Sequence, residues 1–186
     1  YRGRDPFCDP FCGSGTIPIE AALIAKNRAP GLDRSFDAQR WAFLPQNAWL
    51  DAADEAMDKE FHGKYDIWGG DVDPHAIAIA RSNAVKAGVE DCIRFEVADM
   101  KNFRRDSQYG QLVTNPPYGE RLMDRAEAEE LYRAFGQVWR QLPAGWRTLV
   151  LSSHTEFERT FGRTADKKRK LYNGMIKCDL FMYGNV

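Results

Sequence analysis

Short apolar segments alternate along the chain with longer segments whose apolar residues recur at helical spacing. Gly, Pro or acidic residues bound the short segments, as is typical of β-strands. These segments predict strands over residues 5–9, 65–68, 92–97, 109–114 and 148–152, and two more over 171–176 and 177–183. Helical spacing predicts helices over residues 17–27, 47–61, 74–87, 126–142 and 155–161. Strands that alternate with helices in this way indicate an α/β fold.

The first predicted strand leads into a glycine-rich turn, residues 9–16, with the sequence DPFCGSGT. Glycine in a strand-to-helix turn lets the backbone come close to a ligand. Pro18 stands where the dinucleotide pattern needs a small residue, and the Gly-Lys-Ser/Thr of a phosphate loop is absent. Pyrophosphate and triphosphate ligands are therefore both disfavoured. Asp9 before two glycines fits a ligand with a cationic end better. S-adenosylmethionine, with its sulfonium and α-amino groups, is such a ligand.

Acidic residues also follow the second and third predicted strands. Asp71 leaves the second strand first, where nucleotide-binding α/β folds hold a ribose diol, and Val72 would lie against the adenine. Asp73, with a proline after it, is expected to cap the next helix. After the third strand, Asp99 is a candidate acceptor for the adenine amino group, with Met100 near the ring. For both Asp71 and Asp99 the alternative is a plain turn.

The fourth predicted strand ends in the loop Asn115, Pro116, Pro117 and Tyr118. Open α/β sheets bind ligands at the carboxyl ends of their strands, so this loop should face the ligand. The prolines lack N–H donors and leave rigid carbonyl acceptors, while Asn115 adds a side-chain acceptor and Tyr118 a flat aromatic face. Acceptors beside a stacking surface suit a planar substrate with an amino group. A Pro-Pro turn with a solvent-facing Tyr is the alternative.

Composition narrows the class of protein. The 186 residues suffice for one domain, and the net charge of −1 argues against a strong autonomous nucleic-acid binder. No apolar run approaches the ~20 residues of a membrane span, and no signal peptide is visible. The four cysteines lack the spacing of a zinc site, so we expect no metal and instead buried, reduced thiols in a cytoplasmic protein. The chain starts at Tyr1 and enters a strand almost at once, which suggests a fragment without its upstream part.

Two stretches fall outside the alternating pattern. Residues 28–64 are rich in aromatic side chains, which we expect to pack this insert onto the domain rather than to stack on bases. Residues 163–170 are strongly basic. Most charge runs are solvated faces, and we expect the same here, although this run is the best local anion site in the chain.

Three segments together resemble the S-adenosylmethionine-dependent methyltransferases that act on planar amino groups. They are DPFCGSGTIPIEAA (residues 9–22), GDVD (70–73) and NPPYGERL (115–122). More closely, they look like the rRNA guanine-N2 methyltransferases that carry a THUMP RNA-binding domain, and the aromatic insert is similar to that family as well. The likeness covers nearly the whole chain. One departure is that the N-terminal THUMP region of the family is missing from these residues.

The resemblance implies a Rossmann-like class I methyltransferase domain over residues 1–186, with a seven-stranded, mostly parallel sheet and an antiparallel last strand. It implies a methionine-binding turn at Asp9, Gly13 and Gly15, a ribose acid at Asp71 and an adenine contact at Asp99. Cys12 and Thr16 belong to the same turn and are included among the candidate cofactor residues. Asn115 to Tyr118 would form the catalytic loop, with Asn115 also beside the cofactor. The substrate would be a guanine in RNA of the large ribosomal subunit.

Other functions stay open. Adenine-N6 and glutamine-N5 methyltransferases share the Asn-Pro-Pro-Tyr loop, so the sequence does not exclude them. A nicotinamide-dependent oxidoreductase is disfavoured by Pro18 and by this loop. A non-catalytic RNA-binding module is disfavoured by the near-neutral charge and by the intact acceptor loop. The oligomeric state is not indicated by the sequence.

Overall fold

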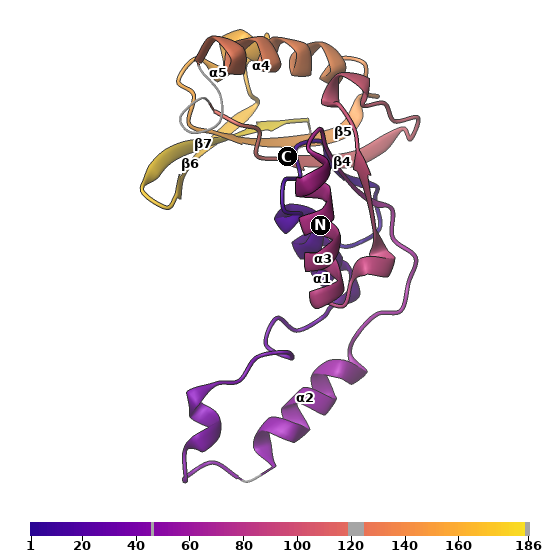
Figure 1. Ribbon diagram of the computed structural model, residues 1–186, viewed down its shortest axis with the longest axis vertical. Helices are drawn as coiled ribbons and strands as arrows, with labels where there is room; N and C mark the ends of the chain where they lie inside the picture. The colour runs from indigo at the N-terminus through magenta and orange to yellow at the C-terminus, as the bar shows by residue number, and fades with distance from the viewer. Residues whose placement is uncertain (46, 119–124, 185–186) are drawn as a thin grey trace.

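A single mixed sheet runs through the molecule, as seen in a computed structural model that describes residues 1–45, 47–118 and 125–184 (Figure 1). The strands are β1 (Phe7–Asp9), β2 (Ile67–Asp71), β3 (Ile93–Val97), β4 (Tyr109–Thr114), β5 (Gly145–Ser152), β6 (Lys167–Asn173) and β7 (Ile176–Tyr183). Their order in the sheet is β3-β2-β1-β4-β5-β7-β6. All pairs are parallel except those of β7, which runs antiparallel to both β5 and β6. The predicted seven-stranded α/β fold with an antiparallel last strand is confirmed.

Helices cover the two faces of the sheet, and each face has its own core. Helices α1 (Thr16–Lys26) and α3 (Pro74–Lys86) lie on one side, and α4 (Arg125–Trp139) and α5 (Phe157–Phe161) lie on the other (Figure 1). Successive residues of a strand point to opposite faces. Accordingly, Phe7 and Ile67 belong to the core under α1 and α3, whereas Cys8 and Trp68 belong to the core under α4 and α5. Short 3₁₀ turns at Asp37–Arg40, Glu90–Cys92 and Met100–Asn102 complete the elements.

Strand β2 covers Ile67–Asp71 rather than the predicted residues 65–68, and it ends later because its two glycines lie inside the strand. A Cβ on Gly69 would lie 2.7 Å from the ring of Phe95, and one on Gly70 would lie 2.3 Å from the ring of Trp68. Glycine therefore makes room here for neighbouring aromatic rings, whereas the sequence pattern predicts that it marks the end of the strand. As a result, Asp71 is the last residue of β2.

The closing hairpin also differs from the prediction. Strand β6 starts inside the basic run, at Lys167, and the turn between β6 and β7 consists of Gly174 and Met175. Gly174 has a φ of +62°, as the first central residue of a two-residue hairpin turn often requires. Every residue of β6 is exposed, so the strand has no alternation of apolar and polar residues that would reveal it. Backbone pairing with β7 defines it instead.

The insert does not pack onto the domain in the way we expected. Its helix α2 (Ala48–Asp58) has no buried residue, and Figure 1 shows the insert extending away from the sheet. The aromatic rings pack on one another: Phe36 stacks on Trp49 and Trp41 stacks on Phe43, each pair with ring centres 5.5 Å apart. Trp41 and Phe43 remain exposed.

Among the described residues, every helix is either too short or too polar to traverse a lipid bilayer.

Candidate active site

A cavity of about 540 Å³ lies at the carboxyl ends of the parallel strands. Its volume is within the range of about 300–1,000 Å³ that is usual for small-molecule sites. The lining comes from the loops after β1, β2, β3 and β4, from α3 and α4, and from the tip of the β6–β7 hairpin. It consists of Pro10, Phe11, Gly13, Asp71, Val72, Asp73, Ala76, Asp99, Met100, Asn115, Pro116, Pro117, Tyr118, Leu131, Asn173 and Ile176. Most of the predicted site residues therefore meet around one space.

Asp71 is held in place by backbone donors on both sides. Its Oδ2 accepts a hydrogen bond from the amide of Gly13 at 3.0 Å, and its Oδ1 accepts one from the amide of Asp73 at 3.0 Å. Each carboxylate oxygen has a further lone pair for a ligand hydroxyl. Asp73 caps α3, as predicted, because its Oδ1 accepts a hydrogen bond from the amide of His75 at 2.8 Å. The two acids after β2 thus have different local partners.

The two glycines of the first turn have different surroundings. Gly13 has a φ of +50°, lines the cavity, and would place a Cβ in open space. Gly15 has a φ of +83°, and its Cβ would lie 2.9 Å from both Ala80 Cβ and Phe95 Cζ. Gly13 therefore keeps space open for a ligand, whereas Gly15 allows helix α1 to pack closely against its neighbours.

Three other predicted cofactor residues do not line the cavity. Thr16 is the exposed first residue of α1. Cys12 is buried, its amide donates to the carbonyl of Gly70 at 2.9 Å, and its side chain packs in the core under α1 and α3. Asp9 is 1% exposed and is not among the residues that line the cavity. The strand-end position of Asp9 was correctly placed, but its side chain points into the protein.

Asp9 joins the end of β1 to the end of β4. Its Oδ1 accepts hydrogen bonds from the amide of Phe11 at 3.0 Å and from Thr114 Oγ1 at 2.5 Å. Burial raises the pKa of the Asp9 carboxyl to about 7, although both hydrogen bonds act to lower it. The nearby charge of Asp71 raises this pKa further. Asp9 thereby orders Phe11 in the cavity wall and the residue that precedes Asn115.

Asn115 presents a buried acceptor without a partner. Among the described residues, no group donates a hydrogen bond to its Oδ1, which is shielded from solvent. A buried amide oxygen without a donor costs about 1–3 kcal/mol, so its presence indicates that a ligand group supplies the missing N–H. Asn115 follows directly after β4 and lines the cavity. This is the side chain that the sequence singled out as the acceptor for a substrate amine.

The remainder of the Asn-Pro-Pro-Tyr loop is fixed from two sides. Tyr132 Oη, on helix α4, donates to the carbonyl oxygen of Pro117 at 2.7 Å. Asn173 Nδ2, at the end of β6, donates to Tyr118 Oη at 2.8 Å. The residues 119–122 of the resembling NPPYGERL segment lie outside the described residues. Sequence analysis missed Tyr132 and Asn173, because each contacts the loop across at least 15 positions of the chain.

Asp99 combines the binding and the capping alternatives. Its Oδ1 accepts from the amide of Lys101 at 2.8 Å, so it caps the short turn after β3, and the residue also lines the cavity. Met100 beside it is 2% exposed and contributes to both the core and the cavity wall. Val72, by contrast, lines the cavity but is 64% exposed, so its apolar side chain is accessible to a flat ligand.

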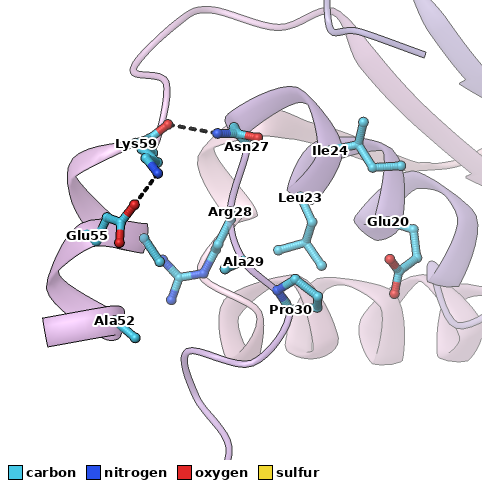
Figure 2. Close-up of a pocket in the computed structure, with 11 residues that line it drawn as sticks. Glu20, Leu23, Ile24, Asn27, Arg28, Ala29, Pro30, Ala52, Glu55 and Lys59 are labelled. Atoms are coloured by element: carbon cyan, nitrogen blue, oxygen red, sulfur yellow. Dashed lines mark hydrogen bonds and ion pairs between the residues drawn. The ribbon is translucent and has the colours of Figure 1, made fainter. Parts of the chain in front are cut away.

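A second hollow of about 510 Å³ separates α1 from α2 (Figure 2). Arg28, one of the residues that line it, makes ion pairs of 2.9 Å to Asp33 and 2.7 Å to Glu60. Asn27 Nδ2 donates to the carbonyl of Lys59 at 3.0 Å, and Lys59 pairs with Glu55 (Figure 2). None of the buried polar atoms that lack a partner lies in this lining, within the described residues. The hollow therefore offers no group that calls for a ligand.

The described part of the chain contains no cluster of three or more His, Cys, Asp or Glu side chains able to hold a metal ion. All four cysteines are buried and free, as expected.

The cavity fits S-adenosylmethionine in several respects. It has adequate volume, an open space at Gly13, an anchored carboxylate at Asp71 and apolar walls for a ring. Together with the order of the sheet, it defines the chain as an S-adenosylmethionine-dependent methyltransferase domain. Residues 1–181 match the family described as "RMKL-like, methyltransferase domain", and the chain belongs to this family.

Relatives support this assignment. The chain is 42% identical over 179 residues to "Putative RNA methyltransferase YpsC" of Bacillus subtilis, covering 96% of this chain and 46% of that protein. It is 38% identical over 180 residues to "Ribosomal RNA large subunit methyltransferase K/L" of Shewanella baltica, covering 94% of this chain and 25% of that protein. The chain thus spans half or less of the length of these curated relatives.

Solved structures agree with the fold. The crystal structure of SMU.472, described as "a putative methyltransferase complexed with SAH", superposes with a TM-score of 0.95 at 40% identity, covering 100% of this chain and 50% of that chain. A "predicted N6-adenine-specific DNA methylase" of Listeria monocytogenes superposes with a TM-score of 0.91 at 45% identity, covering 98% of this chain and 47% of that one. The predicted enzyme class and the predicted cofactor are confirmed.

Proposed function

We propose that this domain methylates RNA, and that its target is the exocyclic N2 amine of a guanine in large-subunit rRNA. The observation that carries the proposal is the buried Asn115 Oδ1, which has no donor among the described residues and lies in the loop that follows β4. The names of the relatives from Bacillus and Shewanella support RNA as the substrate class. A ribosomal substrate implies a cytoplasmic enzyme, which forms part of the proposal.

The residues that line the cavity support an assignment of the cofactor contacts. We propose that Asp71 binds the ribose hydroxyls, that Asp99 accepts from the adenine amino group, and that Val72 and Met100 lie against the ring. Gly13 leaves room for the methionine end. Asp9, Cys12, Gly15 and Thr16 are not among the residues that line the cavity, so they remain in the proposal as the turn that positions Gly13.

The chemistry needs little more than positioning. When bound, S-adenosylmethionine supplies an electrophilic methyl group. The guanine N2 lone pair is delocalised into the ring, so the amine is a weak nucleophile. Asn115 Oδ1 and the Pro116 carbonyl oxygen would accept hydrogen bonds from the two N–H groups of this amine. This would aim the nitrogen lone pair at that methyl group. The same acceptors stabilise the positive charge that grows on the nitrogen as the N–C bond forms and the S–C bond breaks.

Tyr118 would stack on the target base, and its position is fixed by Asn173. A base in structured RNA must first leave its stack, at a cost of a few kcal/mol, which a stacking partner in the pocket offsets in part. The proton of the methylated amine then passes to water, so no strong general base is required.

Adenine-N6 methylation is the second candidate. Adenine presents an exocyclic amine to the same acceptors, and the Listeria relative is named as a predicted N6-adenine-specific DNA methylase. Glutamine-N5 transfer, which the sequence also left open, has no such support among these relatives.

Two measurements test the proposal. The first is a calorimetric titration of S-adenosylmethionine into the purified chain with NAD as the control, and we expect binding of the former alone. The second incubates the protein with methyl-labelled cofactor and unmodified rRNA, followed by nucleoside analysis. N2-methylguanosine supports the proposal, N6-methyladenosine supports the second candidate, and label on protein alone would refute both.

The variant Asn115→Ala tests the role of the orphan acceptor. We expect methyl transfer to be lost, while affinity for the cofactor stays within a few-fold of the unsubstituted protein. Loss of cofactor binding in this variant would show that Asn115 serves the cofactor instead of the substrate amine.

A further inference from the structure

The β6–β7 hairpin concentrates positive charge beside the cavity. Residues 167–177 contain five Lys or Arg residues and no Asp or Glu, in a protein whose net charge is −1. The hairpin is at the edge of the sheet and projects beyond it (Figure 1). None of the residues proposed to bind the cofactor belongs to this hairpin, so its charge has no role in the site described above.

The tip of the hairpin forms part of the cavity rim. Asn173 and Ile176, the two residues that flank the turn, line the cavity. Asn173 Nδ2 also donates to Tyr118 Oη at 2.8 Å. An RNA strand that approaches the catalytic loop from this side would therefore pass along β6.

The two faces of β6 differ in how their charges are used. Lys168 turns to the α5 side, where it pairs with Glu158 at 2.7 Å and lies 5.8 Å from the centre of the Phe181 ring. Alternate residues of a strand share a face, so Lys167 and Arg169 lie on the other face, together with Asn173. Within the described part of the chain, neither Lys167 nor Arg169 has an ion pair or a side-chain hydrogen bond. Their charges are available to an external anion.

Protection of the sheet edge explains only part of this pattern. Charged residues on an exposed edge strand hinder pairing with other strands, and both Lys and Glu are used in this role. A uniform positive sign, on the face that leads to the cavity rim, instead indicates a partner with repeated negative charge. Alternate residues are about 6.8 Å apart, so the row from Lys167 to Asn173 extends over roughly 20 Å, long enough for more than one phosphate.

We propose that the face of β6 that carries Lys167, Arg169 and Asn173 binds the phosphate backbone of the RNA strand next to the target nucleotide. This inference rests on the proposed RNA substrate. Phosphate contacts position a strand without reading its sequence, so the hairpin would hold the strand in register while the loop at Asn115 acts on the base.

The salt dependence of binding tests this inference. Fluorescence anisotropy measures the affinity of the purified protein for a short fluorescein-labelled single-stranded RNA over a series of KCl concentrations. The test variant is Lys167→Gln/Arg169→Gln, and the matched control is Lys64→Gln/Lys86→Gln, which removes the same charge from exposed positions without ion pairs among the described residues. Each lost phosphate contact lowers the log–log salt slope by about 0.7, so we expect a decrease of about 1.4 in the test variant alone.

A second variant removes the concern that a neutral edge strand self-associates. Arg169→Glu keeps the edge charged, and we expect it to bind RNA more weakly than Arg169→Gln. Equal slopes for the test and control variants, with RNA bound by the unsubstituted protein, would overturn the hairpin inference and leave the proposed function intact. Absence of RNA binding by the unsubstituted protein, combined with normal binding of S-adenosylmethionine, would overturn both.

Discussion

Tyr132, in the middle of helix α4, donates a hydrogen bond from its Oη to the carbonyl oxygen of Pro117 at 2.7 Å. The side chain is fully buried, and Ser152 Oγ lies 3.3 Å from the same hydroxyl. Burial raises the pKa of Tyr132 to about 12, so the phenol keeps its proton and remains a donor at neutral pH. The loop that carries Asn115 is thereby attached to the core under α4 and α5.

The variant Tyr132→Phe removes this attachment while it preserves the ring. We expect a decrease in kcat of about tenfold or more, because the acceptors of the loop lose their fixed position. Cofactor affinity should stay unchanged, and stability should fall by about 1 kcal/mol. Steady-state kinetics, calorimetry and thermal unfolding give the three values.

Tyr183→Phe is the matched control for that variant. Tyr183 is another fully buried tyrosine, and its hydroxyl donates to the carbonyl of Arg163 at 3.4 Å, away from the loop. We expect Tyr183→Phe to lose similar stability and to keep kcat. An equal loss of kcat in both variants would show that Tyr132 contributes only to stability.

Asp9 makes the stability of the fold depend on pH. Its pKa rises from 3.8 in the unfolded chain to about 7 in the folded one, so the folded protein binds the additional proton between these values. The resulting stabilisation is fully present below pH 3.8 and is lost as the pH rises through about 7. In Asp9→Asn this contribution disappears.

Denaturant unfolding from pH 5 to 8 should show the free energy of unfolding of the unsubstituted protein falling relative to that of the variant. The full shift corresponds to about 4 kcal/mol at most. Parallel pH profiles for the two proteins would contradict the assignment.

The glycine pair of the first turn should separate stability from binding. Gly15→Ala forces a Cβ against Ala80 and Phe95 at a φ of +83°, so we expect a loss of about 2–4 kcal/mol in the free energy of unfolding. Gly13→Ala meets no atom within 4 Å and should cost about 1 kcal/mol through its φ of +50° alone. Its Cβ would instead occupy cavity space, so cofactor affinity should fall at least tenfold. Calorimetry and chemical unfolding of both variants test this contrast, which similar losses in both properties would disprove.

Asp71 and Asp73 allow a comparison of two neighbouring acids. In Asp71→Asn one oxygen that faces the amide of Gly13 or of Asp73 is replaced by an NH₂ group, and the charge is lost. We expect cofactor affinity to fall by about 10- to 100-fold, as for the loss of a hydrogen bond to a charged group. Asp73→Asn should bind the cofactor nearly normally, since Asn is an equally good helix cap. A greater loss of affinity in Asp73→Asn would assign the ribose to Asp73.

Periodicity and local chemistry were enough to predict the elements that build the cavity. The bounds of β4 agree with the prediction, and α1 and α3 each differ from it by about one residue. The glycine turn before α1, and Asp73 with Pro74 before α3, mark where these helices begin. The loop at Asn115 and the acids Asp71 and Asp99 were located because polar residues at strand ends stand out against apolar strands. Joint motifs then indicated the enzyme class before any geometry was known.

Only the tertiary structure decided which of these side chains face the ligand. Asp9 and Asp71 both end parallel strands, yet Asp9 turns inward to Phe11 and Thr114 while Asp71 reaches the cavity. The sequence predicted only the end of strand β6, over residues 171–173. Its start at Lys167 was missed because an exposed edge strand has no buried face, and its pairing with β7 depends on backbone hydrogen bonds that any side chains permit.

The sequence by itself thus determined the fold class, the cofactor and the position of the Asn115 loop at the end of β4, since these depend on local patterns along the chain. The contacts of Tyr132 with Pro117 and of Asn173 with Tyr118 join residues that are 15 and 55 positions apart. Such contacts exist only once the sheet has brought α4 and the hairpin to the end of β4, so the tertiary structure alone decided how the loop is held.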